Sequence, residues 1–292
     1  MTDIAVIILT KNEKLHIRRC LEKLVPLEPR QIFIVDCFST DETKSIVENF
    51  AKSLQLQLAP PPKSSSLQLQ LETPTINLVE HEWPGNQAAQ FQWAIENLPI
   101  ETKWILRLDA DEYLTDELTA EIKDKLQQMD DDVDGVVLKR RHVVGWLGNR
   151  WIKRGMYPTK ILRLFRKGYG RSDMKIMDEH IVVQRRVVEF EHDFVDHSLI
   201  SFEEWKEKHR NYAKREAQSY LSDERSTGEK AAKKDAYYKL PRYFRAVAYF
   251  MLRYVAKRGF LEGLPALRWH FWQGLWYRWI VDREIGRMKR VS

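Results

Sequence analysis

The sequence of 292 residues predicts an α/β fold, with a mostly parallel central sheet flanked by helices and a helical region at the C-terminal end. A continuously apolar segment at 4–9 and largely apolar segments at 31–36 and 103–109 have the pattern of buried strands. Segments with helical spacing of apolar residues follow the strands, as in parallel α/β proteins. From residue 201 onwards only helical patterns remain.

The first half of the chain alternates strand and helix. The helix after the first strand is predicted from apolar residues at helical spacing: Ile17, Cys20, Leu21 and Leu24. Ser39 and Glu42 form a capping box that predicts the start of the next helix. The buried face of that helix is predicted to carry Ile46, Val47 and Phe50. A strand at 75–80 and a helix around Phe91 complete the pattern before the strand at 103–109.

Residues 53–73 interrupt this alternation. The sequence "SLQLQL" occurs at 53–58 and again at 66–71, with a tract rich in proline and serine between the copies. Strict alternation of Leu and Gln is typical of a strand, and the tract is typical of a turn or a flexible link. We therefore expect an inserted hairpin or loop without a chemical role.

The composition is that of a folded protein, because 43% of the residues are hydrophobic and 31% are charged. Two cysteines, Cys20 and Cys37, are too few for a disulfide scaffold or a zinc knuckle, so a cytoplasmic protein is predicted. The N-terminal segment has the pattern of a strand and not of a signal peptide. A net charge of +6 favours an anionic partner: nucleic acid, an acidic membrane surface or a phosphorylated small molecule.

Three carboxylates crowd the end of the strand "WILRLDADEYL": Asp109, Asp111 and Glu112. Like charges this close need a positive partner, and a divalent cation that bridges a diphosphate is one candidate. Asp36 also ends a predicted strand, which places Asp36 and Asp109 on the rim where α/β sheets bind ligands. The sequence therefore predicts a ligand site at this rim.

Two other interpretations of the acidic segment were weighed. A calcium loop that starts at Asp109 would need Gly and Glu where Leu114 and Ala120 stand, which excludes it. A solvated loop before a helix N-terminus accounts equally well for Glu112 and for the acidic residues at 116–117. For Asp109 and Asp111 a functional role is favoured.

Four segments together carry a resemblance to a known family: "VIILTKNE" at 6–13, "FIVDCFSTDET" at 33–43, "WPGNQAAQFQWAIE" at 83–96 and "LRLDADEYL" at 106–114. In order and spacing the chain resembles family 2 glycosyltransferases. The segments "GNRWIKRGMYPTKILRLFRKG" and "MDEHI" are similar to the bacterial subgroup that includes lipopolysaccharide-core glucosyltransferases. The resemblance implies a GT-A-like fold, an Asp-x-Asp metal motif and inverting chemistry.

The resemblance also implies roles for residues at the rim. Asp36 matches the carboxylate that recognises the base, Asp109 the residue near ribose and metal, and Asp111 the direct metal ligand. The first nucleotide-contacting loop is matched by Thr10, Asn12 and Glu13. From the residues alone, Asp36 could equally start a turn, and Glu13 could equally stabilise the first turn of the next helix.

The catalytic base is expected in "KIMDEHIVV", with Glu179 as first choice and Asp178 as the reserve. A charged turn is the alternative for this segment. His197 matches a histidine that closes over the metal or the diphosphate in relatives, although such a residue is as often simply hydrogen bonded. Arg163 is singled out among the basic residues because a strand interior seldom contains an arginine.

One segment departs from the family pattern. Many relatives place Lys or Arg where this chain has Gln87, Gln90 and Gln92. A phosphate contact from this helix is therefore not expected, although amides can still contact sugar hydroxyls.

The C-terminal region is predicted to be helical, basic and aromatic. Ser201 and Glu204 form a capping box for its first helix. A later helix is predicted to carry a basic stripe of Arg242, Arg245, Arg253 and Lys257. Four tryptophans fall on one helical face: Trp269, Trp272, Trp276 and Trp279. These features suit a membrane interface, and a hairpin packed against the rest of the protein or a second subunit explains them equally well.

Together, these features predict a catalytic domain at 1–215 and a helical region at 216–292. The expected activity is metal-dependent, inverting transfer from a nucleotide-diphospho-sugar, UDP-linked, to a cell-envelope glycan or glycolipid. Mn²⁺ or Mg²⁺ is the expected cofactor, the cytoplasm or the inner membrane face the expected location, and nucleic acid is not an expected partner. The oligomeric state is not predicted. Alternatives are a sugar-nucleotide pyrophosphorylase, disfavoured because "LTKNEKLH" lacks glycine, and a basic membrane-binding adaptor.

Overall fold

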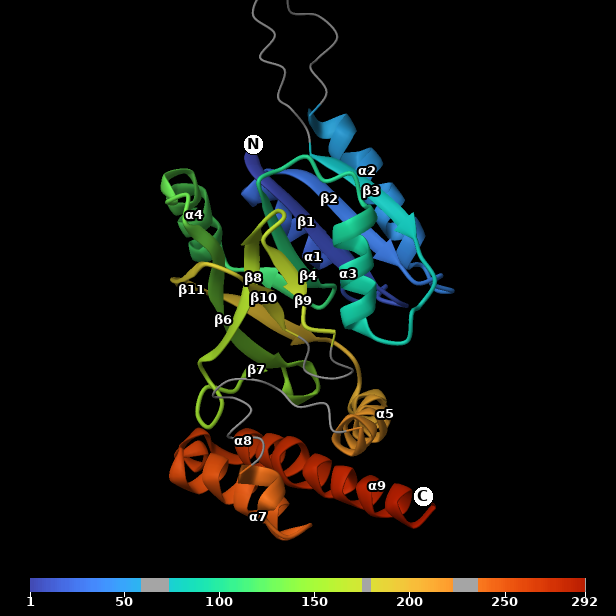
Figure 1. Cartoon of the computed structure of the whole chain (residues 1–292), viewed down its shortest axis with the longest axis vertical. Helices are drawn as coiled ribbons and strands as arrows, with labels where there is room; N and C mark the ends of the chain where they lie inside the picture. Colours follow the sequence, from blue (N-terminus) through green and yellow to red (C-terminus); the bar gives the residue numbers. More distant parts are fainter. Residues whose placement is uncertain (59–73, 175–179, 223–235, 292) are drawn as a thin grey trace, which may run out of the picture. The chain divides into compact units, whose positions relative to one another are not determined.

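The computed structural model describes residues 1–58, 74–174, 180–222 and 236–291. These residues form two compact units (Figure 1). The N-terminal unit contains residues 1–140, 160–174 and 180–198, and the C-terminal unit contains residues 141–159 and 199–291. The helix that starts at 202 therefore belongs to the C-terminal unit, although it falls within the catalytic domain expected at 1–215.

The N-terminal unit is an α/β unit, as predicted. Its strands are β1 (Thr2–Thr10), β2 (Pro29–Asp36), β3 (Thr75–Glu80), β4 (Trp104–Asp109), β5 (Glu112–Leu114), β6 (Val133–Val144), β8 (Thr159–Arg166), β9 (Gly170–Ser172), β10 (Ile181–Val183) and β11 (Arg186–Ser198), where β6 and β8 cross the boundary between the units. Its helices are α1 (Ile17–Leu24), η1 (Val25–Leu27), α2 (Thr43–Leu58), α3 (Gln87–Asn97), α4 (Asp116–Lys125) and η2 (Leu126–Gln128).

The main sheet is parallel in one half and mixed in the other. Its order among the described strands is β3-β2-β1-β4-β8-β6-β11-β5. The strands β1 to β4 pair in parallel, whereas β8 pairs antiparallel to β4 and β11 antiparallel to β5. In register, Thr10 lies opposite Asp36, and Leu9 lies opposite Asp109. The two aspartates therefore end strands on either side of β1, on one rim, as the sequence predicted.

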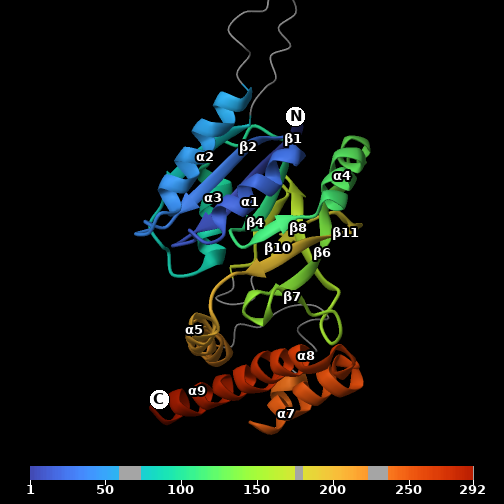
Figure 2. The same ribbon diagram turned by 180° about the vertical axis from the view of Figure 1, so that it is seen from behind.

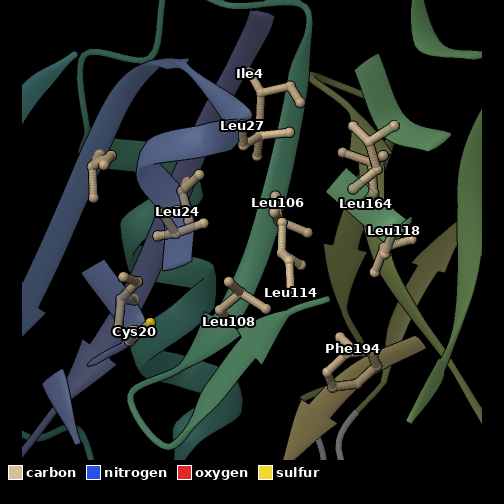
Figure 3. Close-up of a cluster of buried hydrophobic side chains, with 14 of the residues drawn as sticks. Ile4, Cys20, Leu24, Leu27, Leu106, Leu108, Leu114, Leu118, Leu164 and Phe194 are labelled. Carbon is tan, nitrogen blue, oxygen red and sulfur yellow. The ribbon is translucent and has the colours of Figure 1, made fainter. Parts of the chain in front are cut away.

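The alternation of side chains along β1 explains why helices cover both faces of the sheet. Ile4, Val6 and Ile8 point into a core shared with α1, α2 and α4 (Figure 3). Their neighbours Ala5 and Ile7 point to the opposite face, where α3 supplies its buried side chains. Figure 1 shows α3 in front of the sheet. Figure 2 shows the molecule from the opposite side, where α1 and α2 lie in front of the sheet. The predicted strands and helix faces of residues 4–50 are confirmed.

Two local predictions were wrong. The helix α2 begins at Thr43, so Ser39 does not cap it; the Ser39 hydroxyl donates to Asp36 at 2.6 Å. The amide of Thr43 instead donates to Asp41 at 3.0 Å. The first "SLQLQL" copy is the last part of α2 and not a strand, because the helix extends to Leu58. The second copy, at 66–71, lies outside the described residues.

A buried carboxylate fastens α4 to β11. Glu121 accepts hydrogen bonds from the amides of Glu191 at 2.9 Å and His192 at 3.0 Å, and from Lys125 at 2.7 Å. Burial alone would raise the pKa of Glu121, but these donors outweigh it and lower the pKa to about 2. The ionised form of Glu121 therefore stabilises the fold.

We expect this carboxylate to make the fold sensitive to acid. Because the pKa of Glu121 falls from 4.5 to about 2 on folding, its contribution is present above pH 4.5 and is lost as the pH falls towards 2. The contribution is roughly 3 kcal/mol. Urea unfolding across this pH range should show a smaller loss of stability for Glu121→Gln than for the parent chain. Glu22→Gln, on an exposed pair, is the control; equal losses in all three proteins would contradict the prediction.

The C-terminal unit is mainly helical. Its elements are η3 (Gly145–Leu147), β7 (Arg150–Trp151), α5 (Phe202–Leu221), α7 (Phe244–Met251), η4 (Leu252–Ala256), η5 (Gly259–Glu262), α8 (Gly263–Trp269), η6 (His270–Trp276) and α9 (Tyr277–Val291). The capping box of Ser201 and Glu204 is present at the start of α5. Figures 1 and 2 both show α7, α8 and α9 side by side. None of the described helices is long and apolar enough to span a bilayer.

The tryptophan stripe is mostly internal packing of this unit. Trp269 is buried, and Trp269 and Trp276 contact the ring of Trp205 on α5, with centroids 5.8 and 6.1 Å apart. Trp272 is partly buried and packs against Phe202, whereas Trp279 is 45% exposed. The first three tryptophans therefore pack inside the C-terminal unit.

The predicted basic stripe is wrong in part, because Arg245 and Arg253 are buried. The Nε of Arg245 donates to Asp282 at 2.7 Å, which ties α7 to α9. Glu216 on α5 similarly accepts from Tyr277 at 2.6 Å and Arg278 at 2.5 Å on α9. Polar residues at these positions hold helices together and do not face outwards.

Candidate active site at the carboxyl rim of the sheet

Asp36 is the centre of a buried hydrogen-bond network where β1 and β2 end. Its Oδ1 accepts from the hydroxyl of Thr10 at 2.8 Å, and its Oδ2 accepts from the amide of Ser39 at 2.6 Å. Asp36 is fully buried and Thr10 is 3% exposed. The structure thus contains the turn that was the alternative role of Asp36, while recognition of the base stays a prediction.

Asn12 and Glu13 join the loop after β1 to the loop after β2. The side chain of Asn12 accepts from the amide of Thr40 at 2.8 Å, and the amide of Glu13 donates to Thr43 at 2.8 Å. A carboxylate oxygen of Glu13 also lies 2.7 Å from Nδ1 of His16. Glu13 stands four residues before Ile17, where α1 begins, so it is not in the first turn of that helix. The two loops form one connected rim.

A buried arginine joins two of the three crowded carboxylates. Arg163 on β8 donates to Glu112 at 2.5 Å and to Asp109 at 3.2 Å. Glu112 is 2% exposed and also accepts from the amide of Asp109 at 3.0 Å. Arg107 lies 3.7 Å from the other oxygen of Asp109. The positive partner that the sequence required is therefore supplied in part by the chain itself, and Glu112 is not in a solvated loop.

The two carboxylates that share Arg163 differ in their pKa values. Burial would raise the pKa of Asp109, but the guanidinium groups of Arg163 and Arg107 outweigh it, so the net pKa is lowered. Burial raises the pKa of Glu112, and the neighbouring carboxylates Asp109 and Asp196 add to this, although Arg163 opposes them. Asp109 is therefore the ionised member of the pair.

One carboxylate oxygen of Asp109 has no hydrogen-bond donor among the described residues. Its Oδ2 accepts from Arg163, whereas its Oδ1 accepts no hydrogen bond from any described residue. A buried carboxylate oxygen without a hydrogen-bond donor costs free energy unless a ligand or an ion interacts with it. A hard divalent cation prefers oxygen ligands of this kind, so the residues at the rim fit such an ion.

Asp111 and His197 lie next to each other in the structure. The amide of His197 donates to the carbonyl of Asp111 at 3.0 Å. Arg19 on α1 fixes both, because its guanidinium donates to the carbonyl of His197 at 2.5 Å and to that of Asp111 at 3.3 Å. Arg19 is also 3.1 Å from Nδ1 of His197. The structure thus brings His197 beside Asp111, although the two residues lie far apart in the sequence.

The described residues do not form a complete metal cage. No group of three or more His, Cys, Asp or Glu side chains in the described part of the chain could hold a metal ion. An ion at Asp109 and Asp111 would therefore need further ligands, which phosphate oxygens can supply. Glu179 and Asp178, the predicted base and its reserve, lie outside the described residues.

The amides on α3 serve the fold more than a ligand. Gln90 is fully buried and its Oε1 is 2.8 Å from Nδ1 of His81. Gln92 accepts from the amide of Ser172 at 2.9 Å and donates to Glu96 at 2.7 Å. Of the three glutamines singled out on this helix, Gln87 is the exposed one.

Two arginines of this site were not predicted. Arg107 stands inside "WILRLD", and the argument that singled out Arg163 in a strand interior applies to it equally. Arg19 gave no such signal, because an arginine on a helix between apolar positions is an ordinary surface residue until the fold brings β11 beside it.

A sheet that is parallel on one side and mixed on the other, with Asp-x-Asp after its central strand, defines a GT-A-like transferase fold. Residues 5–189 match the family model described as Glycosyl transferase family 2. The chain belongs to this family and is a glycosyltransferase. The predicted fold class is confirmed.

One solved structure shows the same fold, and a second is less similar. The mannosyltransferase PcManGT from Pyrobaculum calidifontis, in complex with GDP-Man and Mn²⁺, is 16% identical with a TM-score of 0.53, over 97% of this chain and 86% of that one. TarS (1–349) from S. aureus is 14% identical with a TM-score of 0.42, over 100% and 92% of the two chains. No curated protein matches this chain.

Proposed function

We propose that this glycosyltransferase transfers a sugar from a nucleotide-diphospho-sugar to a hydroxyl group, with inversion at the anomeric carbon. The observation that carries the proposal is the position of Asp109 and Asp111 at the rim of the parallel strands, where the pKa of Asp109 is lowered and its Oδ1 accepts no hydrogen bond from a described residue. Ligands of α/β sheets bind at this rim. PcManGT, which shares the fold, was solved with GDP-Man and Mn²⁺.

Asp109 and Asp111 would hold a divalent cation, Mn²⁺ or Mg²⁺, with His197 beside them. When bound, the cation would stabilise the charge that grows on the departing diphosphate. Arg163 and Arg107 keep Asp109 ionised, and Arg19 fixes the backbone of Asp111 and His197. The charge of Asp109 and the backbone of Asp111 and His197 are thus preorganised in the absence of the donor.

The base is proposed to be Glu179, with Asp178 as the reserve. A carboxylate within hydrogen-bond reach of the acceptor hydroxyl takes its proton as the oxygen attacks the anomeric carbon. The bond from that carbon to the diphosphate breaks at the same time on the opposite face, so the nucleoside diphosphate leaves with the bonding electrons. Thr10, Asn12, Glu13 and Asp36 are proposed for the nucleotide side of the site.

The finer features of the proposal come from sequence resemblance. They are a UDP-linked donor, an acceptor in a cell-envelope glycan or glycolipid, kinship with lipopolysaccharide-core glucosyltransferases, and work at the inner face of the cytoplasmic membrane. The GDP-Man of PcManGT shows that a fold of this kind also binds another base. The donor base is therefore the first feature to test.

Thermal unfolding in the presence of nucleotides should reveal the donor class. We expect Mn²⁺ together with UDP to raise the melting temperature more than Mn²⁺ with GDP or dTDP, because a ligand that binds only the folded state stabilises it. A chelator should abolish the rise if the metal joins the rim to the diphosphate. A rise with one of the other nucleotides would correct the base, whereas no rise with any of them would contradict the proposed donor.

A further inference from the structure

The C-terminal unit exposes a group of large apolar side chains on consecutive helical segments, called here the apolar face. On α7 and η4 the apolar residues recur at spacings of three and four positions, so they share one side of the helix. On η5 and α8 further large side chains are exposed. Each member of this apolar face is between 42% and 60% exposed: Phe244, Val247, Met251, Leu252, Val255, Phe260, Leu261 and Leu264.

The apolar face is not needed for packing inside the unit. The opposite side of α7 supplies the buried contacts, where Arg245 is bonded to Asp282 and Ala246 is fully buried. Eight large apolar side chains within 21 positions far exceed the scattered apolar residues of an ordinary surface. Exposed apolar patches of this kind mark surfaces that bind something.

The charge around the apolar face is strongly positive. Residues 236–281 contain eight Lys and Arg and a single acidic residue, Glu262. The carboxylate of Glu262 accepts from the amides of Lys153 at 3.1 Å and Arg154 at 2.9 Å, so it is already engaged. Five cations of this stretch are exposed: Lys239, Arg242, Lys257, Arg258 and Arg268.

We infer that the apolar face docks into the interface of an anionic phospholipid bilayer, with the exposed cations at the level of the phosphates. Apolar side chains beside lysine and arginine are the pattern of segments that lie in the membrane surface. A second copy of the chain is a poorer occupant, because a twofold contact would bring the same cations against one another without carboxylates to pair with them. The apolar face belongs to the C-terminal unit and the residues of the proposed transfer site to the N-terminal unit, and the inference does not depend on the donor.

Vesicle binding by the full chain tests this inference. Sedimentation with vesicles of equal parts phosphatidylcholine and phosphatidylglycerol should capture the protein, and vesicles of phosphatidylcholine alone should capture much less. High salt should weaken the capture, since it screens the cations. The triple variant Met251→Gln, Leu261→Gln, Leu264→Gln should bind at least about tenfold more weakly.

Matched changes elsewhere provide the control. Val182 and Val187 in the N-terminal unit are 43% and 41% exposed, so the variant Val182→Gln, Val187→Gln alters similar side chains outside the apolar face. This control should bind vesicles like the parent chain, and both variants should keep the parent melting temperature. Equal binding by the triple variant, or no capture of the parent chain by anionic vesicles, would overturn the inference.

Two further measurements separate the outcomes. If the parent chain self-associates in equilibrium sedimentation, and the triple variant does not, while neither binds vesicles, the apolar face is an interface between copies and the inference is wrong. Stabilisation by Mn²⁺ and nucleotide is measured on the same proteins without vesicles. Vesicle binding without nucleotide binding would leave this inference standing and would count against the proposed donor alone.

Discussion

Replacing Asp111 by Asn should lower the rate of sugar transfer by about 10²–10³-fold, since removal of one group that stabilises transition-state charge costs this much in other enzymes. Asp111 lies at the rim beside His197, whose amide donates to the Asp111 carbonyl. Asn keeps the size of the side chain but removes the charge that attracts a divalent cation. Release of nucleoside diphosphate at saturating donor, followed over a range of Mn²⁺ concentrations, measures the loss.

Asp116→Asn is the matched control for this prediction. Asp116 stands in the first turn of α4, five residues further on, and its side chain is 80% exposed. We expect this variant to keep the parent rate, because it lies outside the rim. If Asp111→Asn also kept more than a tenth of the rate, with an unchanged requirement for Mn²⁺, the proposed metal site would be in the wrong place.

Replacing Arg163 by Met should destabilise the fold by about 3–5 kcal/mol, as expected when one partner of a buried ion pair is removed. Arg163 bonds to both Glu112 and Asp109, and without it two carboxylates would face each other with Arg107 alone nearby. Urea unfolding at neutral pH measures this loss. Arg18→Met, on an exposed helix pair, should cost almost nothing and serves as the control.

A double variant shows whether the pair itself is responsible. Glu112→Gln replaces the buried carboxyl group that loses its donor when Arg163 is removed. The double variant should therefore be less destabilised than the sum of the two single variants by about 1–3 kcal/mol. Strictly additive losses would mean that Arg163 acts through packing alone, for example through its contact with the ring of Phe194.

Strands were easier to predict than the boundaries of helices. Residues 4–9 are apolar at every position because helices cover both faces of the sheet. This pattern does not depend on how individual side chains pack. The capping box failed because Ser39 had a stronger use, as a donor to the buried Asp36. At 53–58 the alternation of Leu and Gln was read as a strand, but the helix that starts at Thr43 simply continues.

The carboxylates of the site were visible in the sequence, and most of their partners were not. Asp109 and Asp111 follow a strand that had to be central, and Arg163 stood out because it interrupts a strand. Pairing between β5 and β11 brings Asp111 beside His197, which lies 86 residues later in the sequence. The register of this pairing cannot be predicted from a local sequence pattern. The exposed side of α7 was equally hidden, since sequence spacing does not tell which face the rest of the unit covers.

The direction of pairing changes at β4, which is parallel to β1 on one side and antiparallel to β8 on the other. Asp109 ends the strand at this seam. The two halves of the sheet therefore supply different parts of the rim: β2, in the parallel half, ends in Asp36, whereas β8 and β11, in the mixed half, carry Arg163 and His197. A substitution that shifts one half should change one side of the rim and leave the other side in place.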